Sequence, residues 1–341
     1  MHIALHQNQQ THKSSFSFKW SEFLNKYSVR YKTLDFLHFG SLKRISDFDA
    51  VMWHFFHNPL DKMAAFAILN SLELKSEILV WPNQSTRWHF DDKVAQYFLL
   101  KSHNLPVVDS WVFWSEAAAL DALPKLKTPI VAKLKSGAGS ANVMLLENNK
   151  EITQHIERSF RQGIFPYTLN EFRNSRSGNL ALRMKESFDF ITTSIYPSLP
   201  TTNWLPEKGY VYFQKFLNKN PFDTRITVIG DRAFGFLRFN RTNDFRASGS
   251  GKLDHNPSNV DLECVSIAFR ISQKFGFQSM AYDFLYDQGV PLIVEISYGY
   301  DDTAIYNCPG HWDKSMNWVE GNMWPQEAHV VDLIEQINGA K

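Results

Sequence analysis

The stretch that decides the fold is Ser279-Met-Ala-Tyr-Asp283-Phe-Leu-Tyr-Asp-Gln-Gly-Val-Pro-Leu-Ile-Val-Glu295-Ile-Ser297. Two apolar runs flank Asp287-Gln-Gly289, whose composition is typical of a turn, so the stretch predicts a β-hairpin. Each apolar run also contains an oxygen-bearing side chain. Because side chains alternate between the two faces of a strand, Glu295 and Ser297 lie on one face.

The hairpin brings two carboxylates together. If Gln288–Val290 form a three-residue loop, Asp283 lies opposite Glu295 on the neighbouring strand and on the same face. Carboxylates this close repel each other unless a cation lies between them. Oxygen ligands suit a hard ion, and Mg²⁺ is usually held by one or two carboxylates plus substrate phosphates. The hairpin therefore belongs to an enzyme that acts on nucleotide phosphates, or it lies at the edge of a sheet with its acids solvated.

The composition excludes several classes of protein. The chain has 341 residues, enough for two or three packed units. Its 36 basic and 35 acidic residues give a net charge of +1, so we expect neither nucleic acid nor a membrane surface as a partner. The two cysteines form no disulfide framework, and the N-terminus lacks the pattern of a signal peptide. We expect a soluble cytoplasmic protein.

Residues 1–107 alternate between strand-like and helix-like segments, which favours a small α/β domain with a mostly parallel sheet. The expected strands are 3–6, 32–36, 50–55 and 77–81, and the expected helices are 20–27, 61–72 and 91–100.

We expect α+β structure in the remainder of the chain. We expect strands at 129–134, 142–147, 210–216, 225–229 and 233–239, and helices at 152–160, 260–275 and 327–337. Residues 161–209 have a broken pattern and are interpreted as an insertion, and residues 298–325 as a long tail rich in aromatic and polar side chains.

Two basic segments are candidates for binding phosphate. Lys133 ends a buried-looking strand, and the following Lys135-Ser-Gly-Ala-Gly-Ser-Ala141 loop has glycines that let backbone N–H groups approach phosphate oxygens. The alternative is an ordinary hairpin loop beside a surface lysine. Arg238, Arg241 and Arg246 follow an apolar strand, and their forked side chains suit phosphate and carboxylate. The alternative there is a solvated basic loop.

Several short motifs follow one another between about residues 78 and 300, with a gap at 161–209. They are Trp81-Pro-Asn83 with Asp91-Asp-Lys93, Pro129-Ile-Val-Ala-Lys133, Ser136-Gly-Ala-Gly-Ser140, Tyr212-Phe-Gln214-Lys-Phe-Leu217, Asp223-Thr-Arg225 with Val228-Ile-Gly230, Asp244-Phe-Arg246-Ala-Ser248, and the hairpin. In this order and spacing they resemble the ATP-grasp superfamily of carboxylate–amine ligases. The most similar branch contains the ribosomal-protein glutamate ligase and glutathione-synthetase-like enzymes.

The resemblance implies a fold of mixed α/β and α+β class. An N-terminal Rossmann-like domain (1–107) would be followed by two α+β subdomains that clasp ATP. The central subdomain (108–209) would carry the glycine-rich lid and the insertion. The C-terminal subdomain (210–341) would carry the metal site and the aromatic tail.

The resemblance also implies roles for individual residues. ATP would contact Lys93, Lys133, Ser136, Gly137, Gln214, Lys215, Phe216, Leu217, Asp223 and Ser248. Asp283, Glu295 and Ser297 would bind Mg²⁺. Arg238 would stabilise the transferred phosphoryl group, with Arg241 in reserve and Arg246 assisting. Two positions depart from the pattern: Lys215 stands where a Glu is common, and Ser297 stands where the third metal ligand is usually Asn.

The reaction implied is ATP-dependent and Mg²⁺-dependent. The γ-phosphoryl group of ATP passes to a carboxylate, an amine attacks the acyl phosphate, and ADP and phosphate are released. The partners would be a small carboxylate and an amine. Because the 298–325 tail resembles that of ATP-grasp proteins linked to bacterial surface polysaccharides, an amino acid or amine joined to a uronic-acid sugar is favoured. The tail is equally consistent with a structural wrap. Two alternatives stay open: a small-molecule kinase on the same fold, and a nucleotide-binding regulator that lost catalysis at Ser297.

Overall fold

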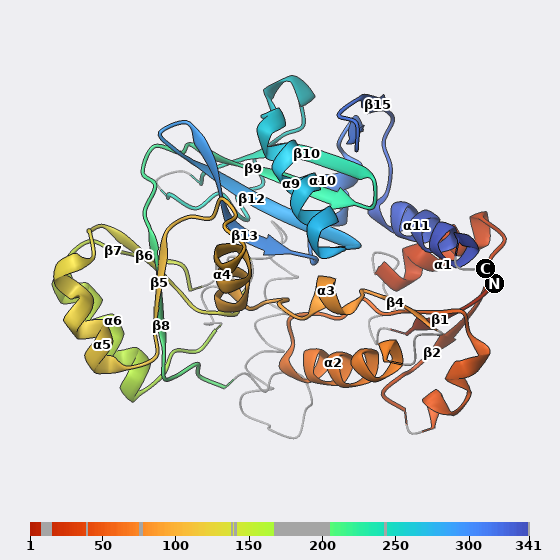
Figure 1. Ribbon diagram of the computed structural model, residues 1–341, viewed down its shortest axis with the longest axis horizontal. Coiled ribbons are helices and arrows are strands. Elements are labelled where there is room, and N and C mark those ends of the chain that lie inside the picture. The colour runs from red at the N-terminus through yellow and green to blue at the C-terminus, as the bar shows by residue number, and fades with distance from the viewer. Residues whose placement is uncertain are drawn as a thin grey trace, which may run out of the picture.

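The computed structural model describes residues 1–7, 16–38, 40–74, 78–137, 139, 142–166, 205–241 and 244–339. Three sheets organise these residues (Figure 1). Most of the insertion expected at 161–209, and Ser140 of the glycine-rich loop, lie outside the described residues. The mixture of one parallel sheet with two further sheets confirms the predicted fold class.

The first sheet is parallel throughout, as the alternating pattern predicted. Its strands run in the order β2-β1-β3-β4 and comprise β1 (His2–His6), β2 (Arg30–Leu34), β3 (Ala50–Met52) and β4 (Leu79–Trp81). The helical segments of this part are α1 (Phe16–Lys26), η1 (Ser41–Asp47), α2 (Pro59–Glu73), α3 (Gln84–Arg87) and α4 (Lys93–Ser102). Helix α2 begins where it does because Asn58 caps its first N–H groups and Pro59 occupies the first turn.

The second sheet is antiparallel, in the order β5-β8-β6-β7. It contains β5 (Ser110–Phe113), β6 (Ile130–Lys133), β7 (Met144–Leu146) and β8 (Val211–Lys215), and is accompanied by α5 (Glu116–Ala122), η2 (Leu123–Lys125) and α6 (Asn149–Arg161). Strand β8 follows the insertion in sequence, and we predicted it in the third unit. It pairs instead with β5 and β6, because its apolar residues fill the core of the second unit. The division into three units remains otherwise a prediction.

The third sheet is the largest, in the order β13-β12-β9-β10-β14-β15, with β11 paired to β10. Its strands are β9 (Phe222–Ile229), β10 (Arg232–Phe239), β11 (Leu253–Asp254), β12 (Ser279–Asp287), β13 (Val290–Ser297), β14 (Gly310–Asp313) and β15 (Trp318–Glu320). The helical segments are η3 (Pro257–Asn259), α9 (Leu262–Phe275), α10 (Asp302–Tyr306) and α11 (Pro325–Gly339). The tail after residue 298 therefore contains regular structure that the sequence did not predict, because β14 forms by pairing with distant β10 and β15 by pairing with β14.

The decisive hairpin has the predicted pairing with a different turn. Asp287 pairs with Val290, so the loop has two residues, and both Gln288 (φ 53°) and Gly289 (φ 86°) adopt positive φ as a tight hairpin turn requires. The predicted three-residue loop is therefore wrong. A β-bulge next to Asp283 shifts the register by one residue and restores the pairing of Asp283 with Glu295, which confirms that the two carboxylates are opposite each other.

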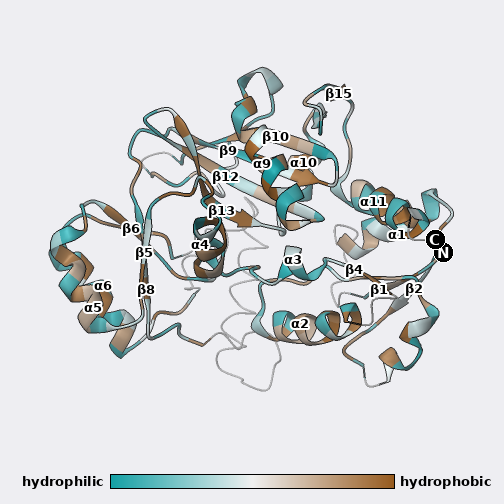
Figure 2. Cartoon of the chain, in the orientation of Figure 1, coloured by the Kyte–Doolittle hydropathy of each residue, from teal (hydrophilic) through white to brown (hydrophobic). Residues whose placement is uncertain are grey.

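The first and third sheets share one apolar core, whereas the second has its own. Trp20, Trp53 and Trp81 lie in the same buried cluster as Tyr282 and Tyr298. Figure 2 shows helices such as α2, α5 and α9 with polar and apolar residues along each, as expected for helices that cover a sheet on one side.

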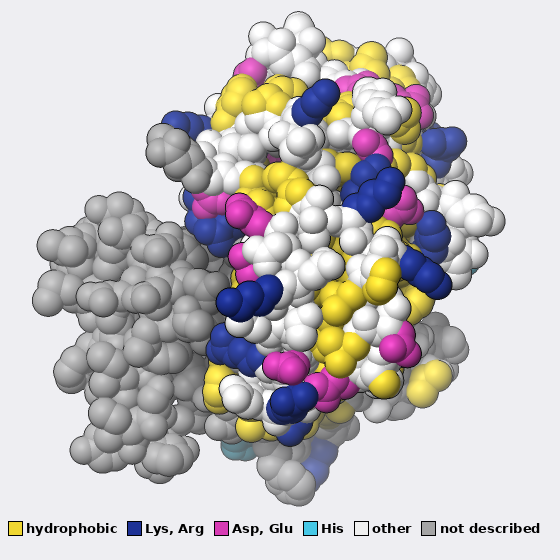
Figure 3. Space-filling model, turned by 90° about the vertical axis from the view of Figure 1, so that its left-hand side faces the viewer, with side chains coloured by type: hydrophobic (Ala, Val, Ile, Leu, Met, Phe, Trp, Pro, Cys, Tyr) yellow, Lys and Arg dark blue, Asp and Glu magenta, His cyan; other side chains and the backbone are white. Residues whose placement is uncertain are grey.

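The outer face of the second unit carries basic and acidic side chains interspersed, without a region of one sign (Figure 3). Within the described part of the chain, no helix has the length and apolar character needed to span a membrane.

Candidate active site

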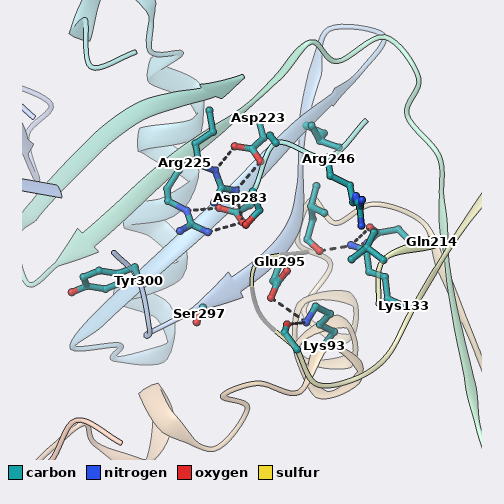
Figure 4. A pocket seen from close by; sticks show the side chains of 18 of the residues that line it. Lys93, Lys133, Gln214, Asp223, Arg225, Arg246, Asp283, Glu295, Ser297 and Tyr300 are labelled. Atoms are coloured by element: carbon teal, nitrogen blue, oxygen red, sulfur yellow. Dashed lines mark hydrogen bonds and ion pairs between the residues drawn. The ribbon is translucent and has the colours of Figure 1, made fainter. Parts of the chain in front are cut away.

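A cavity of about 810 Å³ lies where the three sheets approach one another. It brings together residues that are more than 200 positions apart in the sequence (Figure 4). Among the predicted site residues, those that line it are Lys93, Lys133, Gly137, Gln214, Lys215, Phe216, Leu217, Asp223, Arg238, Arg246, Ser248, Asp283, Glu295 and Ser297. Ser136 and Arg241 are the two predicted residues that do not line it.

The two predicted lysines are both buried at the cavity. Lys93 opens α4, whose N-terminus is capped by Asp92, and its Nζ donates to Gly137 O at 2.6 Å. Burial lowers the pKa of Lys93, but the negative charges of Glu295 and Asp91 outweigh this effect and raise it. Lys93 is therefore a stable cation at neutral pH.

Lys133, at the end of β6, differs from Lys93 in the direction of its pKa shift. Its Nζ donates to Gln214 Oε1 at 2.6 Å, and Gln214 is held by the neighbouring strand β8. Burial lowers the pKa of Lys133 to about 8. The negative charge of Glu295 opposes this effect, and the positive charge of Lys93 adds to it. A bound anion beside Lys133 would offset this desolvation.

The end of β8 and the residues after it contribute backbone and aromatic surface. Lys215, Phe216 and Leu217 line the cavity, while the ammonium group of Lys215 pairs with Asp287 at the surface. The Phe216 ring packs edge-on against Phe245, with centroids 5.5 Å apart. The replacement of the common Glu by Lys215 thus places a charge that points away from the cavity.

Asp283 belongs to a buried network of two acids and two arginines. Its carboxylate accepts hydrogen bonds from Arg225 at 2.7 and 2.8 Å, and Arg238 Nη2 lies 2.8 Å from Asp283 Oδ2. Arg238 also donates two hydrogen bonds of 2.7 Å to Asp223. The network is neutral as a whole, so its four charges compensate one another inside the protein.

The two acids of this network differ in pKa. Burial raises the pKa of Asp223, and the charge of Asp283 adds to the effect while Arg238 opposes it. For Asp283 burial acts in the same direction, but the charges of Arg225 and Arg238 outweigh it and hold the pKa below its usual range. Asp283 is therefore an anion at neutral pH. The contact of Asp223 with ATP remains a prediction, and both of its oxygens bind Arg238 here.

The carboxylate of Glu295 is less tightly engaged. Its Oε1 lies 3.4 Å from Lys93 Nζ, and about a third of the side chain is exposed to the cavity. Among the described residues no three His, Cys, Asp or Glu side chains form a cluster that could hold a metal alone. Both oxygens of Asp283 contact arginine here, so Glu295 offers the freer oxygens. Mg²⁺ binding by this pair, completed by substrate phosphates, remains a prediction.

Ser297 is the weakest of the three predicted metal ligands. Its hydroxyl donates to Gly299 O at 2.9 Å and accepts from Gly299 N at 3.1 Å. These local bonds leave one lone pair on the oxygen. Its role as a ligand stays a prediction.

Three other predicted residues have local partners. The Ser136 hydroxyl donates to Glu207, outside the cavity lining. Arg241 Nη2 donates to Ser248 O at 2.6 Å, and Arg246 pairs with Asp244. Ser136 and Arg241 could reach a phosphate in the cavity only after rearrangement, whereas Arg246 already lines it. The proposed roles of all three remain predictions.

Some lining residues were not among the predicted site residues. Arg225 is one; it shares a face of β9 with Asp223 through two-residue alternation, a signal present in the Asp-Thr-Arg motif. Asn240, Tyr300 and His57 also line the cavity, but nothing in their local sequence marks them. Only the tertiary structure brings them to the site.

Comparison with solved structures decides the fold. A D-alanine–D-alanine ligase from Bacillus anthracis complexed with ATP matches with a TM-score of 0.59 at 11% identity, covering 100% of this chain and 99% of that one. The chain has the ATP-grasp fold. An ATP-grasp RimK domain protein from Sphaerobacter thermophilus matches with a TM-score of 0.54 at 13% identity, covering 98% of this chain and 100% of that one. The ATP-grasp ligase PsnB complexed with its minimal precursor gives 0.58 at 13% identity (98% of each chain).

The likeness to these ATP-grasp proteins concerns the fold, given such low identities. Neither a protein-family model nor a curated protein matches the sequence. The predicted resemblance to ATP-grasp ligases is confirmed at this level.

Proposed function

We propose that this protein is an ADP-forming ligase that joins a carboxylate to an amine through an acyl phosphate. The observation that carries the proposal is one cavity in which two buried lysines face two opposed carboxylates, Asp283 and Glu295. This combination suits a polyphosphate neutralised by both ammonium groups and a divalent cation. The ATP-grasp fold supports it.

In the proposed reaction the protein mainly positions and neutralises charge. Lys93 and Lys133 would exchange their present acceptors, Gly137 O and Gln214 Oε1, for phosphate oxygens. Asp283 and Glu295 would hold Mg²⁺, which when bound neutralises charge on the phosphates as a Lewis acid. Residues 215–217 would contact the base of the nucleotide.

Arg238 is proposed to stabilise the transferred phosphoryl group. In the structure its guanidinium is shared by Asp223 and Asp283. This pairing fixes the fork beside the metal ligand Asp283, so the positive charge is pre-positioned for the reacting phosphate. The glycine-rich loop around Gly137 would close over the acyl phosphate and exclude water.

The proposed substrates are an amino acid or other amine and a carboxylate such as a uronic-acid sugar. Tyr300 and Asp301, from the start of the aromatic tail, line the cavity and support a role of this tail in the acceptor site. The link to surface polysaccharide rests on resemblance alone. Both cysteines are buried and free, which fits the cytoplasmic compartment proposed for an ATP-dependent enzyme.

The experiment that tests the function supplies the protein with Mg²⁺, ATP, pooled carboxylates and pooled amines, and measures ADP, free phosphate and AMP. We expect ADP and phosphate in equal amounts only when both substrates are present. ADP without free phosphate, from one substrate, would instead identify a kinase. No turnover but a rise in melting temperature with ATP would identify a binding regulator. AMP and pyrophosphate would contradict the acyl-phosphate mechanism.

Nucleotide binding should also involve a proton at Lys133. With its pKa lowered to about 8, Lys133 is roughly half deprotonated at pH 8, and a phosphate beside it should restore the charge. We expect uptake of about half a proton per bound ATP at pH 8 and much less at pH 6.5. Calorimetry in buffers of different ionisation enthalpy measures this uptake. The variant Lys133→Met should lose it, and equal uptake in that variant would contradict the assignment.

A further inference from the structure

A histidine and an aspartate at the cavity have no part in the proposed phosphate chemistry. His57 lies in the segment after β3, and Asp91 lies just before α4. His57 lines the cavity with 31% of its side chain exposed, whereas the side chain of Asp91 is 1% exposed. Nδ1 of His57 is buried and lies 3.1 Å from Asp91 Oδ1. Since Nδ1 faces the acid, Nε2 is the ring nitrogen left for the cavity.

The aspartate behind His57 is held firmly and is ionised. Asp91 Oδ2 accepts from Lys62 Nζ at 2.7 Å, and Oδ1 accepts from Gly137 N at 2.8 Å. Burial raises the pKa of Asp91, but nearby His57 and the charges of Lys62 and Lys93 lower it below its usual range. An ionised carboxylate beside an imidazole stabilises the imidazolium that forms when the ring takes a proton.

A series of contacts links the pair to Glu295, one of the proposed metal ligands. Gly137 connects it to the metal carboxylate: its N–H donates to Asp91, and its carbonyl accepts from Lys93, whose Nζ lies 3.4 Å from Glu295. On the other side the His57 ring packs on Phe90, with centroids 4.8 Å apart, and Phe90 adjoins Gly299 after the metal strand.

The other histidine of the cavity is unsuited to proton transfer. His54 is 7% exposed and its ring stacks on Phe16 with centroids 3.9 Å apart. Burial, with the charge of nearby His57, lowers the pKa of His54 to about 3. Among the described residues, the titratable groups recorded beside His57 are Asp91, with Lys62 behind it, and His54.

Resting on the proposed function, we propose that His57 is the general base that deprotonates the attacking amine, with Asp91 as its positioning residue. An alkylamine is protonated at neutral pH and has no lone pair for attack. His57 Nε2 takes one proton from R–NH₃⁺. The nitrogen lone pair then forms the C–N bond, and the bond from the acyl carbon to the phosphate oxygen breaks. The phosphate leaves as HPO₄²⁻ with the second nitrogen proton, and His57 returns its proton to water.

The test compares two nucleophiles. Hydroxylamine is largely uncharged at pH 7.5, so it traps an acyl phosphate as a hydroxamate without a base. Wild type and His57→Gln both receive Mg²⁺, ATP and a panel of carboxylates made up of amino acids and uronic acids. In one arm the nucleophile is hydroxylamine. In the other arm it is a panel of ammonium, amino acids and diamines. We expect amide formation by the variant to fall about 10²- to 10⁴-fold, and hydroxamate formation to stay within about threefold. The exposed His38→Gln serves as control and should match wild type.

Further readouts separate catalysis from structure. Free imidazole should restore amide formation to His57→Ala, and amide formation by His57→Gln should rise about tenfold per pH unit as the amine itself loses its proton. Unchanged amide formation in His57→Gln, or an equal loss with hydroxylamine and no imidazole rescue, would overturn the inference. A wild type that forms neither hydroxamate nor amide would instead overturn the proposed function, and this inference with it.

Discussion

Replacing Glu295 by Gln should abolish turnover while leaving the protein folded. Glu295 supplies one of the two opposed carboxylates, and the amide of Gln carries no charge for Mg²⁺. We expect turnover to fall by at least about 10³-fold, which corresponds to roughly 4 kcal/mol of transition-state stabilisation. Stability should change by less than about 1 kcal/mol, because Glu295 is only partly buried and Lys93 keeps Gly137 O as acceptor.

Two measurements check the Glu295 prediction. The rate of ADP formation gives turnover, and the rise in melting temperature with ATP, measured with and without Mg²⁺, gives binding. In the variant the Mg²⁺-dependent part of that rise should disappear. Asp287→Asn is a matched control, since Asp287 lies on the same hairpin in a partly exposed ion pair and should leave both quantities unchanged. Wild-type turnover in Glu295→Gln would refute the metal assignment.

Replacing Arg238 by Met should have the largest effect on stability. Arg238 separates Asp223 from Asp283, and all three side chains are buried. Removing the guanidinium leaves two carboxylates close together, with Arg225 paired to Asp283 and Lys133 near it. Breaking a buried ion pair from one side costs about 3–5 kcal/mol, and we expect a loss of this size in the free energy of unfolding at pH 7. Urea unfolding followed by circular dichroism measures it.

The pH dependence gives this prediction a distinct signature. In wild type the pKa of Asp283 is held low, so its contribution to stability is present above its unfolded pKa and is lost as the pH falls through its folded pKa. Without Arg238 the two carboxyls should have raised pKa values, so one of them takes up a proton as the pH falls from 7 toward 5. The difference between variant and wild type should therefore shrink in acid.

Two further variants complete the Arg238 experiment. Arg270→Met removes an exposed arginine whose partner Glu263 is 4.0 Å away, so it should change stability by less than about 1 kcal/mol. Adding Asp223→Asn to Arg238→Met should recover part of the loss, because one buried charge is removed. A loss in Arg238→Met no larger than that of the surface control, or one that does not depend on pH, would show that the network does not stabilise the fold.

Local sequence predicted the elements of this protein better than their partners. The alternation of residues 1–107 predicted the parallel sheet, and the turn composition of Asp287-Gln-Gly289 predicted the hairpin. Strand β8 was placed in the wrong unit, and β14 and β15 were missed altogether. A strand's own residues set its extended conformation, whereas its neighbours are set by contacts far away in the sequence.

The candidate site shows the same division. Asp283, Glu295 and Lys133 were identified because each is a charged residue within or at the end of an apolar segment, and Lys93 was identified through the resemblance to ATP-grasp ligases. All four line the cavity. Ser136 and Arg241 had equally plausible motifs, but hydrogen bonds to Glu207 and Ser248 hold their side chains elsewhere. A motif records which groups are available, and burial and competing partners decide where those groups point.

The sequence by itself determined that Asp283 and Glu295 lie on the two strands of one hairpin, because strand alternation and turn composition are local properties. Their direct pairing needed a two-residue turn and a β-bulge that the sequence did not predict. Only the tertiary structure decided what surrounds them. Arg225 and Arg238 hold Asp283 ionised, Lys93 approaches Glu295 from another unit, and the pair of His57 and Asp91 joins them through Gly137. These charges meet because the apolar strands and helices that carry them pack into shared cores, and that packing depends on the whole chain.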